Sequence, residues 1–179
     1  MKHSRGSDKQ HCVRGLVAEH QTPLIRYARS LLGDEHLARD VVQDAFLKLC
    51  QQSPDDLVGH EAAWLFRVCH HLALNRQRKD RRMTTSSETV RAVSANADPN
   101  HQDPSDQLSA AEDQQRISKL INDLPEQQQQ VIRLKFHSGL KYRQISEATG
   151  LSESNVGFLL HTALQTLRKK MSVTGMPAP

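Results

Sequence analysis

Apolar residues recur along this chain at helical spacing, and strict alternation of apolar and polar residues over five or more positions is absent. The first half of the chain holds three stripes with this spacing: Leu24, Ala28, Leu31 and Leu32; Leu37, Val41, Ala45 and Leu49; and Leu65, Cys69, Leu72 and Ala73. Gly33 is expected to end the first of these helices, and Asp34 is expected to cap the second. The pattern therefore predicts an all-α fold in which no sheet takes part.

The second half of the chain predicts a further set of helices. One helix ends at Pro125, and Pro125 also opens the next helix from an N1-like position. Residues 138–139 (Ser-Gly) are expected to end that helix. Its core side is assigned to four residues: Val131, Ile132, Leu134 and Phe136. A short helix around Tyr142–Thr149 and a long amphipathic helix that runs to Met171 complete the pattern.

The junction between the last two helices has the features of a helix-turn-helix. Gly150 can take the positive φ of the turn, Ser146 is small where two helices approach closely, and Ser152 is an N-cap candidate. Apolar residues on both sides of the turn would pack together: Ile145, Leu151 and Val156. An ordinary helical hairpin is the alternative, but this spacing within a set of four helices favours a helix-turn-helix.

A polar segment separates the two halves. Residues 84–108 are rich in Ser, Asp, Asn and Thr, hold two prolines and show no sustained apolar period, which is the composition of a flexible, acidic linker. Fully extended, these 25 residues would reach roughly 80 Å at about 3.3 Å per residue. The sequence thus predicts two small helical domains, over 10–83 and 109–171.

Composition and charge narrow the class of protein. The 179 residues include no run of eighteen apolar residues, and the charged N-terminus lacks the apolar core of a secretory signal. Three cysteines without regular spacing argue against a disulfide framework, so we expect a reduced, cytoplasmic protein. The formal net charge of +4 favours an anionic partner. Basic residues outnumber acidic ones six to two over 60–83, whereas 34–59 has the reverse ratio.

The helix over about 61–82 carries the first chemical signal. At 100° per residue, one narrow stripe begins with an aromatic ring, passes through hydrogen-bonding groups and ends in arginines: Trp64, His71, Asn75, Arg78 and Arg82. Arginines hold phosphates, amides read base edges and rings stack on bases, so this stripe suits nucleic acid. A solvated basic face with a half-buried tryptophan is the alternative.

The second helix of the helix-turn-helix also separates into two faces. Its inward face is apolar, and base contacts are expected from the outward residues near its N-terminus: Ser154, Asn155, Phe158 and His161. The aromatic ring of Phe158 could touch a thymine methyl group or, equally, a neighbouring helix. Arg168, near the end of the same helix, is a candidate for a phosphate contact.

Together these motifs identify a family. The chain resembles the extracytoplasmic-function (ECF) sigma factors, the small sigma subunits of bacterial RNA polymerase. Residues 38–46 (ARDVVQDAF) resemble the acidic helix of conserved region two, and residues 64–68 (WLFRV) with Asn75 resemble its promoter-melting helix. Residues 124–126 (LPE) and the helix-turn-helix resemble region four. The resemblance covers roughly 16–83 and 110–169.

The resemblance implies a function without catalysis and without a cofactor. Asp40, Gln43 and Asp44 would bind the β′ clamp of core RNA polymerase, and region four would meet its β flap. The third helix and the loop before it would bind the minus-10 promoter element and promote melting, while the recognition helix would read the minus-35 element. Family members are often held by an anti-sigma protein, so such a partner is also expected.

Some residues depart from the family pattern. The usual asparagine of the melting helix is replaced by His71, with Asn75 one turn later. Leu159 and Thr162 stand where the family often has arginines, which removes two expected phosphate contacts. Gly157 lies early in the recognition helix, where it lowers helix stability.

Two other classes of protein compete with the sigma interpretation. A stand-alone DNA-binding regulator would share the helix-turn-helix but would have no need for the acidic helix around Asp40. An enzyme or metal protein is suggested by residues 69–71 (Cys-His-His) and by ten histidines. Adjacent helical residues point about 100° apart, however, so these three side chains cannot readily meet one metal, and Cys69 is better interpreted as a core residue.

Overall fold

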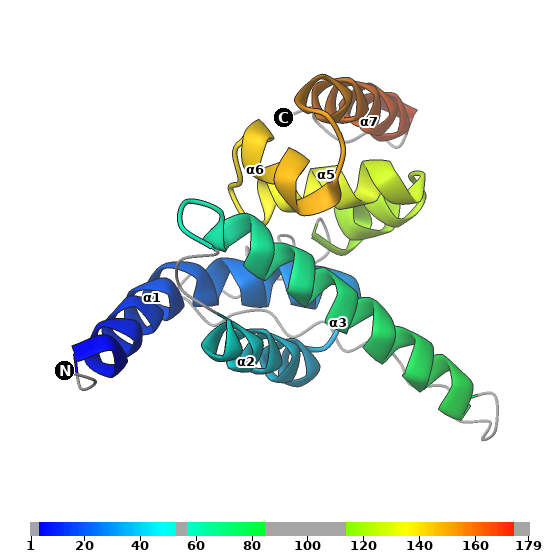
Figure 1. Cartoon of the computed structure of the whole chain (residues 1–179). Helices are drawn as coiled ribbons and strands as arrows, with labels where there is room; N and C mark the ends of the chain where they lie inside the picture. Colours follow the sequence, from blue (N-terminus) through cyan, green and yellow to red (C-terminus); the bar gives the residue numbers. More distant parts are fainter. Residues whose placement is uncertain (1–3, 53–56, 85–113, 174–179) are drawn as a thin grey trace, which may run out of the picture.

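The computed structural model describes residues 4–52, 57–84 and 114–173, and the ordered elements in these ranges are all helices (Figure 1). They are α1 (Ser4–Leu32), α2 (Glu35–Gln51), α3 (Glu61–Thr84), a helix over 114–122, α5 (Glu126–Phe136), α6 (Tyr142–Thr149) and α7 (Glu153–Val173). The all-α prediction is confirmed. Apart from Thr84, the predicted linker over 84–108 lies outside the described residues.

Helices α1, α2 and α3 pack against one another as an N-terminal unit. Gly33 has a φ of 72° and ends α1, and the Asp34 carboxylate accepts a hydrogen bond from the Leu37 N–H at 2.9 Å, so both predicted boundary residues are confirmed. Helix α1 continues through Pro23. A proline inside a helix removes one backbone hydrogen bond, which lowers the stability of the helix. Burial of the residues that follow it offsets this loss, because Leu24, Tyr27 and Ala28 are fully buried.

Helices α5, α6 and α7 form the C-terminal unit. Two residues of this unit differ from their sequence predictions. Pro125 is the N-cap of α5 and not its first helical residue, and Phe136 is 60% exposed, so its assignment to the core side was wrong. Leu134 and Phe136 lie about 200° apart on a helix, and Leu134, at 1% exposed, is the one that faces the core.

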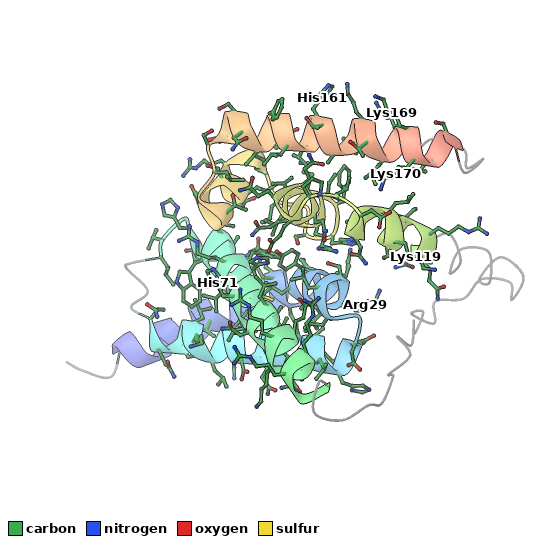
Figure 2. The ribbon with its side chains drawn as sticks, turned by 90° about the vertical axis from the view of Figure 1, so that its right-hand side faces the viewer. Arg29, His71, Lys119, His161, Lys169 and Lys170 are labelled. Carbon is green, nitrogen blue, oxygen red and sulfur yellow. The ribbon has the colours of Figure 1, made fainter. Side chains whose placement is uncertain are left out.

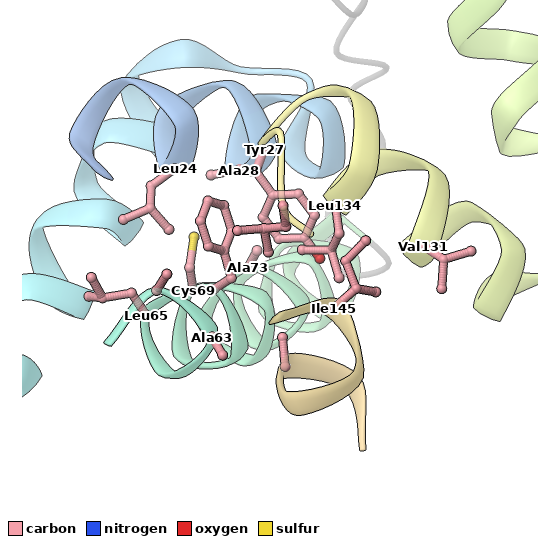
Figure 3. Close-up of a cluster of buried hydrophobic side chains, with 14 of the residues drawn as sticks. Leu24, Tyr27, Ala28, Ala63, Leu65, Cys69, Ala73, Val131, Leu134 and Ile145 are labelled. Carbon is pink, nitrogen blue, oxygen red and sulfur yellow. The ribbon is translucent and has the colours of Figure 1, made fainter. Parts of the chain in front are cut away.

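One hydrophobic core joins the two units. Tyr27 and Phe66 of the N-terminal unit meet edge to face, with ring centroids 5.6 Å apart. Leu134 and Ile145 of the C-terminal unit belong to the same cluster, and Figure 3 shows them beside Tyr27. Contacts between α3 and α6 and between α1 and α5 form this junction. Helix α6 therefore lies between α3 on one side and α7 on the other (Figure 1).

None of the helices in the described ranges combines the length and the apolar content that a bilayer span requires.

Candidate nucleic-acid and polymerase interfaces

The outward side of α2 carries an acidic face, which we define as Asp40, Gln43 and Asp44. All three residues are exposed, while Val41, Val42 and Ala45 between them are buried. The neighbouring Arg39 is held by Glu35, with 2.6 Å between the guanidinium and the carboxylate. This bond is the main cause that lowers the pKa of Glu35. The face is thus presented by a helix whose other side is fixed in the core.

Leu47 continues this acidic face at its C-terminal end and was not predicted as part of it. Its side chain is 58% exposed, although the buried Ala45 and Leu49 flank it. Positions 40, 43, 44 and 47 share one side of a helix, so the i, i+3, i+4, i+7 spacing is the signal that could have found it. An exposed leucine next to the Asp44 carboxylate and the Gln43 amide is a composition expected where a partner protein contributes apolar and basic groups.

The polar stripe of α3, defined as Trp64, His71, Asn75, Arg78 and Arg82, lies on one side of the helix, as predicted. His71, Asn75, Arg78 and Arg82 are exposed, and Trp64 is half-buried against the core. Figure 2 shows His71 on this helix. The stripe combines a supported ring with solvent-facing hydrogen-bonding and cationic groups. Its geometry is compatible with single-stranded or opened DNA, while the role of each residue stays a prediction.

The residues next to the stripe do not form a metal site. Cys69 is fully buried, and burial raises the pKa of its thiol to about 12. His70 turns inward, where its Nδ1 lies 2.9 Å from the Tyr27 hydroxyl. Burial, reinforced by His71 and Arg133, lowers the pKa of His70 to about 4. Within the described residues, no three His, Cys, Asp or Glu side chains gather in a geometry that could hold a metal ion.

The turn between α6 and α7 has the predicted helix-turn-helix construction. Gly150 has a φ of 77° and caps α6. The Ser152 hydroxyl accepts a hydrogen bond from the Asn155 N–H at 3.2 Å, and the Ser146 hydroxyl donates to the Leu151 carbonyl at 2.5 Å. Val156 is fully buried beneath the turn. These contacts fix the angle at which α7 leaves α6.

The outer face of α7, defined as Ser154, Asn155, Phe158, His161 and Arg168, is exposed along its length. Figure 2 shows His161 on the side of α7 that points away from the rest of the molecule. The amide nitrogen of Gln165 lies 2.9 Å from His161 Nε2, which orients the imidazole. Phe158 is 65% exposed, so it is available to a thymine methyl group.

The residues that replace the family's arginines have structural partners. Leu159 packs against the core, and the Thr162 hydroxyl donates to the Phe158 carbonyl at 2.9 Å. Leu159 lies on the buried side of α7, whereas Thr162 lies on the outer side but carries no charge for a phosphate. Basic residues near this face therefore lie toward its C-terminal end, where Lys169 also points outward (Figure 2).

Polar contacts also connect the two units across the α3–α6 junction. The Arg67 guanidinium donates to the carbonyls of Glu147 and Ala148, the latter at 3.2 Å from its Nε. His60 Nδ1 lies 2.9 Å from the Glu147 carboxylate, which also pairs with Arg143 at 3.0 Å. Hydrogen bonds from His60 and Arg143 lower the pKa of Glu147. The sequence analysis predicted none of these contacts.

The fold and these surfaces define an all-helical protein with a helix-turn-helix C-terminal unit, a class rich in DNA-binding modules. Residues 16–83 match the family model for Sigma-70 region 2, and residues 114–167 match that for Sigma-70, region 4. The chain is 30% identical to the ECF RNA polymerase sigma factor SigL of Mycobacterium tuberculosis over 168 residues, which cover 92% of this chain and 91% of SigL.

Further similarities agree with this match. The ECF RNA polymerase sigma factor SigK of Mycobacterium bovis is 25% identical over 80% of this chain and 77% of its own length. The solved structure of CnrH in complex with the cytosolic domain of CnrY has a TM-score of 0.59 at 21% identity, covering 92% of this chain and 90% of that one, so it shows a shared fold. The protein belongs to the ECF family of RNA polymerase sigma factors, which act in transcription initiation and are not enzymes.

Proposed function

We propose that this sigma factor binds core RNA polymerase and directs it to promoters with a minus-10 and a minus-35 element, and that it promotes melting at the former. The observation that carries the proposal is the presence, on one chain, of three exposed surfaces with different chemistry. These are the acidic face of α2, the polar stripe of α3 and the outer face of α7. A stand-alone regulator would use only the last of them.

In this proposal the acidic face of α2 docks on the β′ clamp of the polymerase. Its carboxylates would pair with basic groups of the clamp, and Leu47 would supply an apolar contact at the C-terminal end of the face. Helix α2 is well suited to this role because its buried residues hold it on α1 and α3. Region four would add a second contact, with the β flap.

The polar stripe of α3 would then engage the minus-10 element. Trp64 is supported from beneath by the core and could stack on a base, while His71 and Asn75 offer donors and acceptors to base edges. Arg78 and Arg82 would hold phosphates. A base that leaves the duplex needs a surface of this kind, because stacking on the protein replaces the stacking lost in the DNA.

The outer face of α7 would read the minus-35 element in the major groove. Ser154, Asn155, Phe158 and His161 lie in the N-terminal half of the helix, which is the part that meets base edges in this motif. Arg168 would contact phosphate. The proposal also includes a protein inhibitor that binds the chain, in the way that CnrH is found in complex with the cytosolic domain of CnrY.

A binding-selection experiment tests the proposal. Purified chain, core polymerase and genomic fragments are mixed, and the DNA retained by the complex is sequenced. We expect fragments that share two spaced elements to be retained only when both proteins are present. Specific fragments retained by the chain alone, with no change when polymerase is added, would favour the stand-alone regulator.

A further inference from the structure

The side chains of His161 and Gln165 form a hydrogen-bonded pair on the outward side of α7. They lie one helical turn apart, and both are exposed. The amide nitrogen of Gln165 is 2.9 Å from Nε2 of His161. Because an amide nitrogen donates hydrogen bonds and does not accept them, Nε2 is the acceptor in this contact.

This contact determines which nitrogen of the imidazole carries the proton. A neutral imidazole has one N–H group and one acceptor nitrogen. Since Nε2 accepts from Gln165, the proton lies on Nδ1. Within the described ranges, no other residue is hydrogen-bonded to this ring. Figure 2 shows His161 on the side of α7 that points away from the rest of the molecule, so the pair presents a hydrogen-bond donor to a ligand on that side.

The hydroxyl groups beside the pair are bonded to the backbone of the same helix. The Thr162 hydroxyl donates to the Phe158 carbonyl at 2.9 Å, and the Thr166 hydroxyl donates to the Thr162 carbonyl at 3.0 Å. Neither proton is therefore offered to the imidazole or to the amide, and Gln165 orients His161. A side chain that is oriented before binding loses less conformational entropy when it meets its ligand.

The four bases differ in how they would meet such a donor in the major groove. Guanine presents two acceptors, N7 and O6, whereas cytosine presents the donor group at N4. Adenine has an amino donor beside its N7 acceptor, and thymine has a methyl group beside its O4 acceptor. A donor held in one position is therefore matched best by guanine. Cytosine is matched worst, because two donors that face each other leave both groups without a partner.

We propose that His161 and Gln165 act as one unit that selects a guanine in the minus-35 element. The Nδ1–H group of His161 donates to an acceptor of the guanine, and Gln165 is the positioning residue that fixes the tautomer. This inference rests on the proposed function, in which the outer face of α7 lies in the major groove. The opposite tautomer, with the proton on Nε2, would present an acceptor and would prefer the amino groups of adenine and cytosine.

Nitrogen NMR tests the tautomer in the free protein. Proton–nitrogen correlation spectra of the imidazole rings distinguish a protonated ring nitrogen from an acceptor nitrogen, and His161→Ala identifies the signals of His161. The spectra are recorded at about pH 8, where a free imidazole is neutral. We expect the proton on Nδ1 in the parent protein and a mixture of both tautomers in Gln165→Leu. A proton on Nε2 in the parent protein would overturn the proposal.

Selection from a duplex library tests the choice of base. Duplexes randomised over the upstream element are selected by core polymerase with the parent protein, with Gln165→Leu or with Gln127→Leu, which makes the same change at an exposed site of α5. The parent protein and the Gln127→Leu control should prefer guanine over cytosine about five- to tenfold at one position. Gln165→Leu should lose this preference and keep the preferences at the other positions. The same guanine preference in Gln165→Leu would contradict the positioning role.

The two experiments separate this inference from the proposed function. Circular dichroism first establishes that each variant is folded. If spaced elements are selected and His161→Ala keeps the guanine preference, the proposed function stands and the inference is wrong. If the parent protein and polymerase select no spaced elements, the proposed function fails and the base-reading role of His161 fails with it, whereas the tautomer measured by NMR stands.

Discussion

At the scale of single residues, burial decides the chemistry of side chains that look alike in the sequence. His70 and His71 are adjacent, yet His70 bonds to the buried Tyr27 and His71 faces solvent. Asp34 and Asp40 are both carboxylates on the surface, but the first caps a helix and the second is presented outward. The cap could be predicted from its position after Gly33. The inward orientation of the His70 side chain could not be predicted, because it depends on Tyr27, which lies 43 positions earlier in the chain.

The buried imidazole predicts a pH-dependent stability. Native His70 stays neutral down to about pH 4, whereas an exposed imidazole in the unfolded chain takes up a proton below about pH 6.5. The unfolded state therefore binds more protons between these values, and the free energy of unfolding should fall as the pH drops from 6.5 toward 4. His70→Gln, which cannot titrate, should flatten this dependence in urea titrations at several pH values. The exposed His36→Gln is the control, and equal slopes in parent and His70→Gln would contradict the assignment.

Substitution of the acidic face of α2 should weaken polymerase binding and leave the fold intact. Asp40→Ala and Asp44→Ala remove exposed carboxylates, so each should lower the affinity for core enzyme about fivefold, with a smaller effect at high salt. Fluorescence anisotropy of the labelled protein measures this affinity. Glu19→Ala, an exposed carboxylate of α1, should bind like the parent. Normal affinity in both aspartate variants would remove the proposed role of this face.

At the scale of elements, the residues in the turns were the best guide to where each helix begins and ends. Residues 142–149 form α6 as predicted, and Gly33, Gly150 and Ser152 occupy the positions expected of them. The start of α1 was not predictable, because Pro23 normally marks the first turn of a helix and here lies inside one. The prediction that Phe136 faces the core is wrong, because its position lies about 200° from that of the buried Leu134 around the helix.

Two glycines of the helix-turn-helix should respond to alanine in opposite ways. Gly150 has a positive φ, so Gly150→Ala should destabilise the protein by roughly 1–2 kcal/mol although the site is open. In Gly157→Ala the new methyl group would meet the Tyr142 ring at 3.6 Å, an ordinary contact, and helix propensity should stabilise the protein by about 0.5–1 kcal/mol. Thermal unfolding measures both changes. Equal effects of the two substitutions would contradict this account of the turn.

The outer face of α7 should determine the choice of upstream element. Asn155→Ala and His161→Ala remove exposed polar groups without disturbing the buried side of the helix, so binding of the minus-35 element should weaken by about 1–3 kcal/mol where a base contact is lost. Footprinting of the polymerase complex measures this loss. Ser172→Ala, exposed at the end of the same helix, is the control. Unchanged protection across the element would contradict the base-reading role.

At the scale of the whole molecule, the two units were predicted to have separate hydrophobic cores, but they share one core. Local patterns predict which residues are buried, but they do not predict which buried face meets another across a chain distance of 80 residues or more. Arg67 and Glu147 look like ordinary surface charges in the sequence, and only the packing of α6 on α3 makes them partners. The arrangement of the two units therefore depends on contacts between residues that lie far apart in the sequence.

The central claim is that this chain gives core polymerase its promoter specificity. Mapping of transcription start sites in vitro, on genomic DNA with core enzyme in the presence and absence of the protein, tests it most directly. The account predicts new start sites that depend on the protein and share two spaced upstream elements. Start sites that are the same with and without the protein, with a core enzyme that responds normally to another sigma factor, would contradict it.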